Sequence, residues 1–144
     1  MRESNRPTIL VALNAGNEPL VEELRRHAVR VLAARSGVEV VSYLFPRGDS
    51  YAIRPTLMVL SGTLPGYNGL SVLAGVRSMG WRTPVLMTWP SSHEWVADEA
   101  LRLGCSGLFE EPCNSKELVA KVMEIIGAST DCGNLVSRSA RGIA

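Results

Sequence analysis

The sequence has almost no net charge, no long hydrophobic run and few cysteines. Its 144 residues carry 15 lysines and arginines against 14 aspartates and glutamates, a formal net charge of +1. This balance argues against a nucleic-acid partner held by net charge, because such proteins usually carry a basic surplus. Nowhere do about 18 apolar residues follow one another, which argues against a membrane span. The first ten residues also lack the apolar segment of a secretory signal.

Cysteine usage and apolar content indicate a reduced, globular protein. The three cysteines, Cys105, Cys113 and Cys132, are odd in number and lack metal-ligand spacing, so we expect free thiols in a cytoplasmic protein. Apolar residues make up 46% of the chain, too many for a disordered protein. The length fits one domain. We assign this domain to residues 1–127 and expect the polar residues 128–144 to form a flexible tail.

Five short apolar runs predict five buried strands. They are rich in branched side chains and lie at residues 8–13, 38–45, 56–61, 84–89 and 107–110. Such runs are typical of strands that are covered on both faces. A helical pattern follows each run, and right-handed crossovers then give a doubly wound, five-stranded parallel sheet with helices on both faces. Ligand chemistry in such folds lies beyond the carboxyl ends of the strands.

The helical patterns differ in length. Apolar residues from Leu20 to Leu32 recur at helical spacing and predict a first helix of about five turns, ending at Gly37. After a turn over 46–50, we expect only a single helical turn before Pro55, which disfavours helix at the residue preceding it. The remaining helices are expected after the later strands, ending near Gly80, Gly104 and Gly127, with Ser91 or Ser92 capping the fourth and a capping box of Asn114 and Glu117 opening the fifth.

Several of these segments resemble the receiver domain of bacterial two-component response regulators. PTLMVLSGTLPGYNG, residues 55–69, is similar to that family's third strand and the Leu-Pro-Gly loop after it. TPVLMTW, residues 83–89, is similar to the fourth strand, and EALRLGCSGLFEEPC, residues 99–113, resembles the fifth strand with its flanking motifs. The similarity covers roughly residues 8–127 and keeps its spacing without gaps over 55–118. It implies a flavodoxin-like receiver fold and a role in signal transduction.

The resemblance also implies where a phosphorylation site would lie, and each of its key positions holds a different residue. The residues at these positions are Leu13 and Asn14 for the two metal-binding carboxylates, Ser61 for the phosphoacceptor aspartate, Trp89 for the switch threonine or serine, Leu108 for the switch aromatic and Glu111 for the phosphoryl-binding lysine. Magnesium prefers carboxylate ligands, and aspartyl phosphate needs a carboxylate nucleophile beside cations. We therefore expect no catalytic residue, no metal and no cofactor. The resemblance further implies a cis bond between Glu111 and Pro112.

Two tryptophans carry functional hypotheses. We interpret Trp89 as a plug whose indole fills the former phosphate pocket; the alternative is an ordinary core side chain beside Pro90. Trp95 lies in line with Glu99 and Arg102 on the predicted fourth helix. An exposed tryptophan is a typical interface anchor, and in the resembled family this region is the usual partner or dimer surface. We therefore expect a protein partner to bind at these three residues.

These features favour a non-catalytic signalling domain, a pseudo-receiver, that acts through protein–protein contacts without aspartyl phosphorylation. A second copy of the chain is one candidate partner, and we expect neither direct nucleic-acid binding nor membrane binding. Two alternatives stay open. One is a receiver-like domain gated by a small molecule in the altered pocket, and the other is the regulatory domain of a transcriptional regulator.

Overall fold

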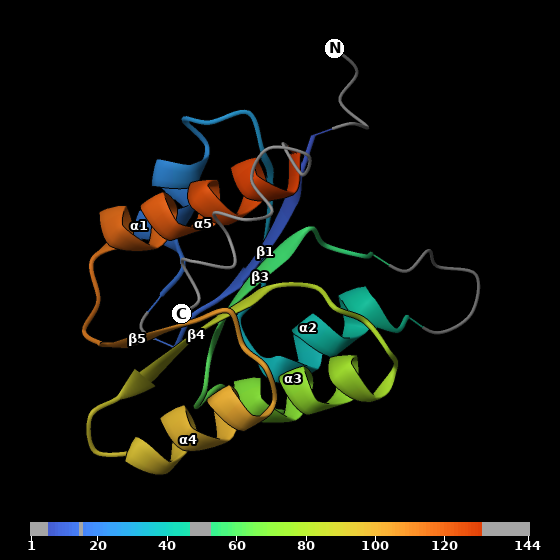
Figure 1. The fold of residues 1–144 in the computed structure, drawn as a ribbon, viewed down its shortest axis with the longest axis vertical. Helices are drawn as coiled ribbons and strands as arrows, with labels where there is room; N and C mark the ends of the chain where they lie inside the picture. The colour runs from blue at the N-terminus through green and yellow to red at the C-terminus, as the bar shows by residue number, and fades with distance from the viewer. Residues whose placement is uncertain (1–5, 15, 47–52, 131–144) are drawn as a thin grey trace.

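The computed structural model consists of five parallel strands and five helices in alternation (Figure 1). It describes residues 6–14, 16–46 and 53–130. The elements are β1 Thr8–Ala12, α1 Glu18–Leu24, β2 Arg30–Ala33, α2 Gly37–Leu44, β3 Leu57–Ser61, α3 Gly69–Ser78, β4 Val85–Pro90, α4 Glu94–Arg102, β5 Gly107–Glu111 and α5 Ser115–Thr130. The strand order is β2-β1-β3-β4-β5, with every pair parallel. The predicted fold class, a doubly wound flavodoxin-like sheet, is confirmed.

Helices cover both faces of the sheet, with α1 and α5 on one face and α2, α3 and α4 on the other (Figure 1). Successive strand residues point to opposite faces, so each strand contributes to both cores. In β3, Leu57 and Val59 pack with α1 and α5, whereas Met58 and Leu60 pack with the other three helices. All of β3 is buried, which explains why a continuous apolar run marked this central strand in the sequence.

The prediction for residues 20–45 is wrong. α1 ends at Leu24, and Val31 and Leu32, assigned to the same helix, instead form β2 and pair with β1. The run 38–45, predicted as the second strand, forms α2. Ser36 caps this helix, because its hydroxyl accepts the backbone N–H of Glu39 at 3.1 Å. The spacing of a serine three residues before a glutamate is a helix-start signal that the sequence interpretation overlooked.

Two predictions around the third and fourth helices also differ from the structure. The single helical turn before Pro55 is absent at Ile53 and Arg54, and the rest of that turn, like most of the turn over 46–50, lies outside the described residues. α4 begins after His93, which makes no capping side-chain hydrogen bond. Neither Ser91 nor Ser92 therefore caps α4, as the sequence had suggested.

The last helix is longer than expected. Asn114 does cap α5, but its side chain accepts the N–H of Lys116 at 2.7 Å, one residue earlier than the predicted capping box with Glu117 requires. α5 continues past Gly127 to Thr130, so the expected domain boundary falls inside the helix. Residues 131–144 of the expected tail lie outside the described residues. No helix in the described part of the chain is long and apolar enough to cross a membrane.

Candidate functional site

Polar side chains meet at the carboxyl edge of the sheet, where β1, β3, β4 and β5 end. They are Asn14, Ser61, Thr63, Thr88 and Glu111. Ser61 and Thr88 are partners in the β3–β4 register, so their side chains project to the same face. Both are fully buried. Buried hydroxyls need hydrogen-bond partners, and the neighbouring strand ends supply them.

A continuous chain of hydrogen bonds joins these five residues. The Glu111 Oε2 atom accepts from Thr88 Oγ1 at 2.7 Å and from Ser61 Oγ at 3.3 Å. The Ser61 Oγ atom lies 3.3 Å from Thr63 Oγ1, and Asn14 Nδ2 donates to Thr63 Oγ1 at 3.1 Å. Because the single Ser61 hydroxyl proton goes to Glu111, Thr63 is the donor to Ser61. Every donor along this chain therefore leads to the Glu111 carboxylate.

The network consists of one carboxylate, three hydroxyls and one amide. No buried side-chain nitrogen or oxygen among the described residues lacks a hydrogen-bond partner. The described ranges also contain no cluster of three or more histidine, cysteine, aspartate or glutamate residues that could hold a metal ion. The hydrogen bonds among these groups join the ends of β3, β4 and β5 to the loops beside them.

The structure separates the residues that the resemblance assigned to one site. Asn14, Ser61 and Glu111 do come together in the network. Leu13 packs with the cluster under α1 and α5, and Leu108 with the cluster on the opposite face. The side chain of Leu13 thus belongs to the core beside the network.

Trp89 is not where the plug interpretation places it. It is half-buried and packs against the apolar cluster beneath α2, α3 and α4, whereas the preceding residue, Thr88, projects to the other face and bonds to Glu111. Successive strand residues alternate in this way. The alternative interpretation, a core side chain beside Pro90, fits the structure, and the position expected for the plug holds the Glu111 carboxylate.

Three polar residues of the site escaped the sequence interpretation. Thr63 and Thr88 link Asn14, Ser61 and Glu111. Asn17 ties the turn after β1 to β2, because its Oδ1 atom accepts the N–H of Leu13 at 2.7 Å and its Nδ2 atom donates to the carbonyl of Ala34 at 2.8 Å. A threonine inside the otherwise apolar fourth strand was the available signal.

The loop from β3 to α3 is packed tightly against its surroundings. The Gly37 N–H donates to the Pro65 carbonyl at 2.9 Å, and a Cβ atom on Gly37 would lie 1.4 Å from the carbonyl oxygen of Tyr67. A Cβ atom on Gly69 would lie 2.2 Å from the Ser61 carbonyl oxygen. Only glycine allows such close backbone approach, so these positions hold the loop at the site in one arrangement.

Comparisons with known proteins agree with this architecture. No protein-family model matches the sequence. The Francisella response regulator 1452 receiver domain superposes with a TM-score of 0.72 at 18% identity, over 86% of this chain and 99% of that one. The phosphorylated cyanobacterial phytochrome response regulator RcpA superposes with a TM-score of 0.70 at 24% identity, over 88% of this chain and 96% of that one.

The chain has the response regulator receiver fold. A curated relative, the alkaline phosphatase synthesis transcriptional regulatory protein SphR of Synechococcus elongatus, is 28% identical over 109 residues, which cover 74% of this chain and 42% of that protein. This chain therefore matches about two fifths of that relative's length.

Within this receiver fold, α4 presents two large apolar side chains to solvent. Trp95 is 56% exposed and Leu101 is 60% exposed. Arg102 forms an ion pair with Glu99 on the same helix, and this hydrogen bond lowers the pKa of Glu99 below its ordinary value. The sequence predicted the exposure of Trp95 and its alignment with Glu99 and Arg102, but it did not single out Leu101.

The two described cysteines of the receiver fold are free thiols, as expected, and Cys132 lies outside the described residues. Burial raises the pKa of Cys105. Burial also raises the pKa of Cys113, and the negative charge of Glu111 raises it further. The Glu111–Pro112 peptide bond is cis, which confirms what the resemblance implied.

Proposed function

We propose that this chain is a pseudo-receiver, a signalling domain that acts through protein–protein contacts without aspartyl phosphorylation. The main support is the hydrogen bond of 3.3 Å between Ser61 and Glu111. By the resemblance, these positions correspond to the phosphoacceptor aspartate and to the lysine that contacts the phosphoryl group. A serine hydroxyl cannot form the acyl phosphate that an aspartate carboxylate forms, and a carboxylate at the second position repels phosphate where a cation would attract it.

A phosphorylation assay tests this proposal. The purified chain is incubated with magnesium and acetyl phosphate, and its intact mass is measured under conditions that preserve acyl phosphates. We expect no added phosphate, whereas RcpA in the same mixture serves as the positive control, since that receiver is known in a phosphorylated form. An acyl phosphate on the wild-type chain would overturn the proposal.

A restored variant identifies the cause. Leu13→Asp, Asn14→Asp, Ser61→Asp and Glu111→Lys together return the carboxylates and the cation that the resembled family uses. We expect this variant, but not Ser61→Asp alone, to gain the phosphate mass in the presence of magnesium. Failure of the fourfold variant would contradict the view that these four side chains account for the lost reaction.

The outer face of α4 is the surface that best fits a protein partner. Large exposed apolar groups beside charged ones are typical of interface centres, and Trp95 and Leu101 provide them next to the Glu99–Arg102 ion pair. Affinity capture from the native cell extract tests this surface with Trp95→Ala. The matched control is Tyr67→Ala, which removes an aromatic side chain of similar exposure, 52%, from the loop before α3.

We expect Trp95→Ala to lose the partner and Tyr67→Ala to retain it. Sedimentation of the purified chain shows whether that partner is a second copy, since the self-association would then also depend on Trp95. Retention of the partner by Trp95→Ala, or its loss from both variants, would contradict the assignment of this face.

The similarity to SphR, which is a transcriptional regulatory protein, favours a second candidate: the regulatory domain of a transcriptional regulator. Immunoblotting of native cells with an antibody against this chain distinguishes the two candidates. A polypeptide much longer than 144 residues would support the regulator, and one of this length would support a stand-alone signalling domain.

A further inference from the structure

The amino edge of the sheet, opposite the hydrogen-bonded network, carries a row of arginines. Strands β2, β1, β3 and β4 lie side by side in that order, and an arginine begins or shortly precedes each of them. In the same order they are Arg30, Arg6, Arg54 and Arg82. We call these four residues the arginine row. All four are exposed.

Backbone hydrogen bonds hold the strand starts next to one another. The Arg30 N–H donates to the carbonyl of Pro7 at 2.8 Å, which places Arg30 beside the start of β1. The Thr56 N–H donates to the Thr8 carbonyl at 2.8 Å, and so joins the starts of β3 and β1. Neighbouring strands are about 4.8 Å apart, so four such strands place their first residues along a line of roughly 14 Å.

The arginine row has no ionic partner among the residues that the structure describes. The salt bridges found there join Arg102 to Glu99 and Lys121 to Glu124, and neither involves the row. Arg54 is held in place by a different contact, because its guanidinium carbon lies 4.2 Å from the centre of the Trp81 ring. A cation stacked on an aromatic ring keeps its charge and its outward donors, so this side chain is ordered and still able to bind an anion.

Helix dipoles explain the placement of four acidic residues but not that of the arginine row. Each helix follows a strand and therefore begins at the carboxyl edge, and four first turns contain a glutamate: Glu18, Glu39, Glu94 and Glu117. Negative charges stabilise helix N-termini. Strands have only small net dipoles, so arginines at their starts gain no such stabilisation.

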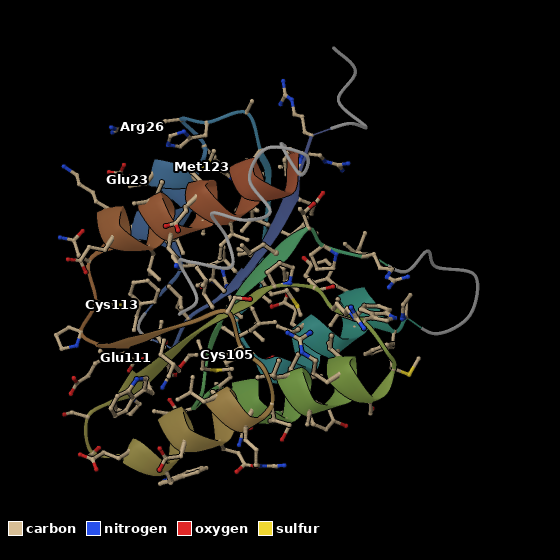
Figure 2. The ribbon with its side chains drawn as sticks, viewed as in Figure 1. Glu23, Arg26, Cys105, Glu111, Cys113 and Met123 are labelled. Atoms are coloured by element: carbon tan, nitrogen blue, oxygen red, sulfur yellow. The ribbon has the colours of Figure 1, made fainter. Side chains whose placement is uncertain are left out.

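Charge is therefore separated along the strands. Figure 2 shows Glu111 by the ends of β4 and β5, and Arg26, which adds to the positive charge, in the loop beyond the far end of α1. Glu22 and Glu23 lie near the C-terminal end of α1. The formal net charge of +1, which argued against binding to an anionic polymer, thus combines positive charge near the strand starts with negative charge near the strand ends.

The sequence segments outside the described residues are not rich in acidic residues. Residues 1–5 and 47–52 each contain one arginine and one acidic residue, and 131–144 contain two arginines and one aspartate. None of these segments has an acidic excess. Within the described residues, the row therefore takes its counter-charge from solvent ions or from another molecule.

We propose that the arginine row binds the phosphate backbone of nucleic acid without reading its base sequence. The strand starts that carry it span roughly 14 Å, which is about four of the 3.4 Å axial steps between successive phosphates of one strand. Guanidinium groups bind phosphate oxygens in pairs. Ion pairs with an acidic protein surface contribute little each, whereas a nucleic acid adds the release of condensed counterions at every phosphate contact. The proposal is independent of the proposed pseudo-receiver function.

Fluorescence anisotropy of a labelled duplex oligonucleotide, titrated with the full chain at 20 to 200 mM NaCl, tests the proposal. Four phosphate contacts give an expected slope of about −3.6 for the logarithm of the binding constant against the logarithm of salt concentration. The variant Arg30→Gln/Arg82→Gln is expected to halve that slope, to about −1.8. The matched control, Arg35→Gln/Lys116→Gln, removes the same charge at the carboxyl edge and is expected to bind like the wild-type chain.

Each result decides the proposal. The expected slopes, with the loss confined to the row variant, support it. No anisotropy change at 20 mM NaCl, or equal weakening by the two variants, overturns it. Polyglutamate displacing the duplex as efficiently as an unlabelled oligonucleotide also overturns it, since an acidic protein surface would then be the better partner.

Discussion

Polar side chains at the two edges of the sheet differ in whether they bond to one another. At the carboxyl edge, Asn14, Ser61, Thr63, Thr88 and Glu111 bond to one another. At the amino edge, the arginine row makes no ion pair within the described residues. The buried hydroxyls of Ser61 and Thr88 must find partners inside the fold, whereas exposed charges keep theirs in solvent or on another molecule. The first edge is accordingly a structural feature, and the second is a surface for contact.

Arg77 shows that position along the strand direction does not alone decide this difference. It lies near the amino edge, at the end of α3, yet its guanidinium donates to four backbone carbonyls, those of Leu103, Trp81, Thr83 and Gly104. Burial lowers the pKa of Arg77 from its ordinary value. An arginine that is half-buried is thus used to join loops, while its exposed neighbours remain free of such contacts.

The largest effect is expected from the close packing behind the carboxyl edge. Gly37→Ala places a Cβ atom 1.4 Å from the Tyr67 carbonyl oxygen, so we expect a loss of about 3 kcal/mol in the free energy of unfolding. Gly75→Ala, in α3, meets nothing within 4 Å and should gain about 0.5–1 kcal/mol from better helix propensity. Urea unfolding measures both. Equal stabilities for the two variants would show that the edge is not tightly packed.

The second-largest difference in stability is expected between variants of the hydrogen-bonded Arg77 and of the exposed Arg82. Arg77→Met removes the donors to four carbonyls and should lower the free energy of unfolding by about 2 kcal/mol, because several polar groups lose their partner. Arg82→Met, at an exposed position, should change stability by no more than about 0.5 kcal/mol. Thermal and urea unfolding of the two variants measure this difference. A large loss of stability in Arg82→Met would contradict the view that only Arg77 stabilises the fold.

A smaller effect is expected within the carboxyl-edge network itself. Glu111→Ala leaves the fully buried Thr88 hydroxyl without its acceptor, which should cost about 1–2 kcal/mol. Glu111→Gln keeps an acceptor oxygen and should cost less. The neighbouring Glu110 is exposed, and Glu110→Ala serves as the control with almost no expected change. Stability of Glu111→Ala equal to that of the control would mean that the network does not hold the edge together.

The smallest effect concerns the two cysteines. Both have a raised pKa, so both thiols are protonated at neutral pH and react slowly with iodoacetamide, faster as the pH rises, because the thiolate is the nucleophile. Glu111→Gln removes one cause of the raised pKa of Cys113 and should speed its alkylation at neutral pH. Cys105, whose pKa does not depend on Glu111, is the internal control. An equal change at both thiols, followed by mass spectrometry, would contradict this cause.

The sequence predicted best where the strands are buried on both faces. β3 and β4 are short, largely apolar runs bounded by proline or glycine, and runs of this length favour a strand over a helix. β2 is an edge strand of four residues with half-exposed side chains, and its Val31 and Leu32 continue the helical spacing of α1. Tertiary pairing with β1 decided between two patterns that the local sequence allowed equally.

The site was predictable in position but not in its contacts. The carboxyl ends of parallel strands meet at one edge, so Asn14, Ser61 and Glu111 were expected near each other. The sequence did not indicate that Glu111 turns inward to Thr88 and Ser61, because the direction of a side chain depends on packing around it. Threonine is common in strands, so nothing in the sequence indicated that Thr88 donates a hydrogen bond to Glu111.

The opposed charges of the two edges have a consequence for how the molecule meets others in solution. A molecule with almost no net charge but with oppositely charged edges is attracted only weakly as a whole to a charged polymer, yet the polymer's electric field exerts a torque on it. Within the screening distance, about 8 Å at physiological salt, that torque turns the molecule so that the strand starts lead. The molecule is therefore oriented before it contacts the polymer. In that orientation α4, with its exposed tryptophan, lies away from the contact and can still bind a protein partner.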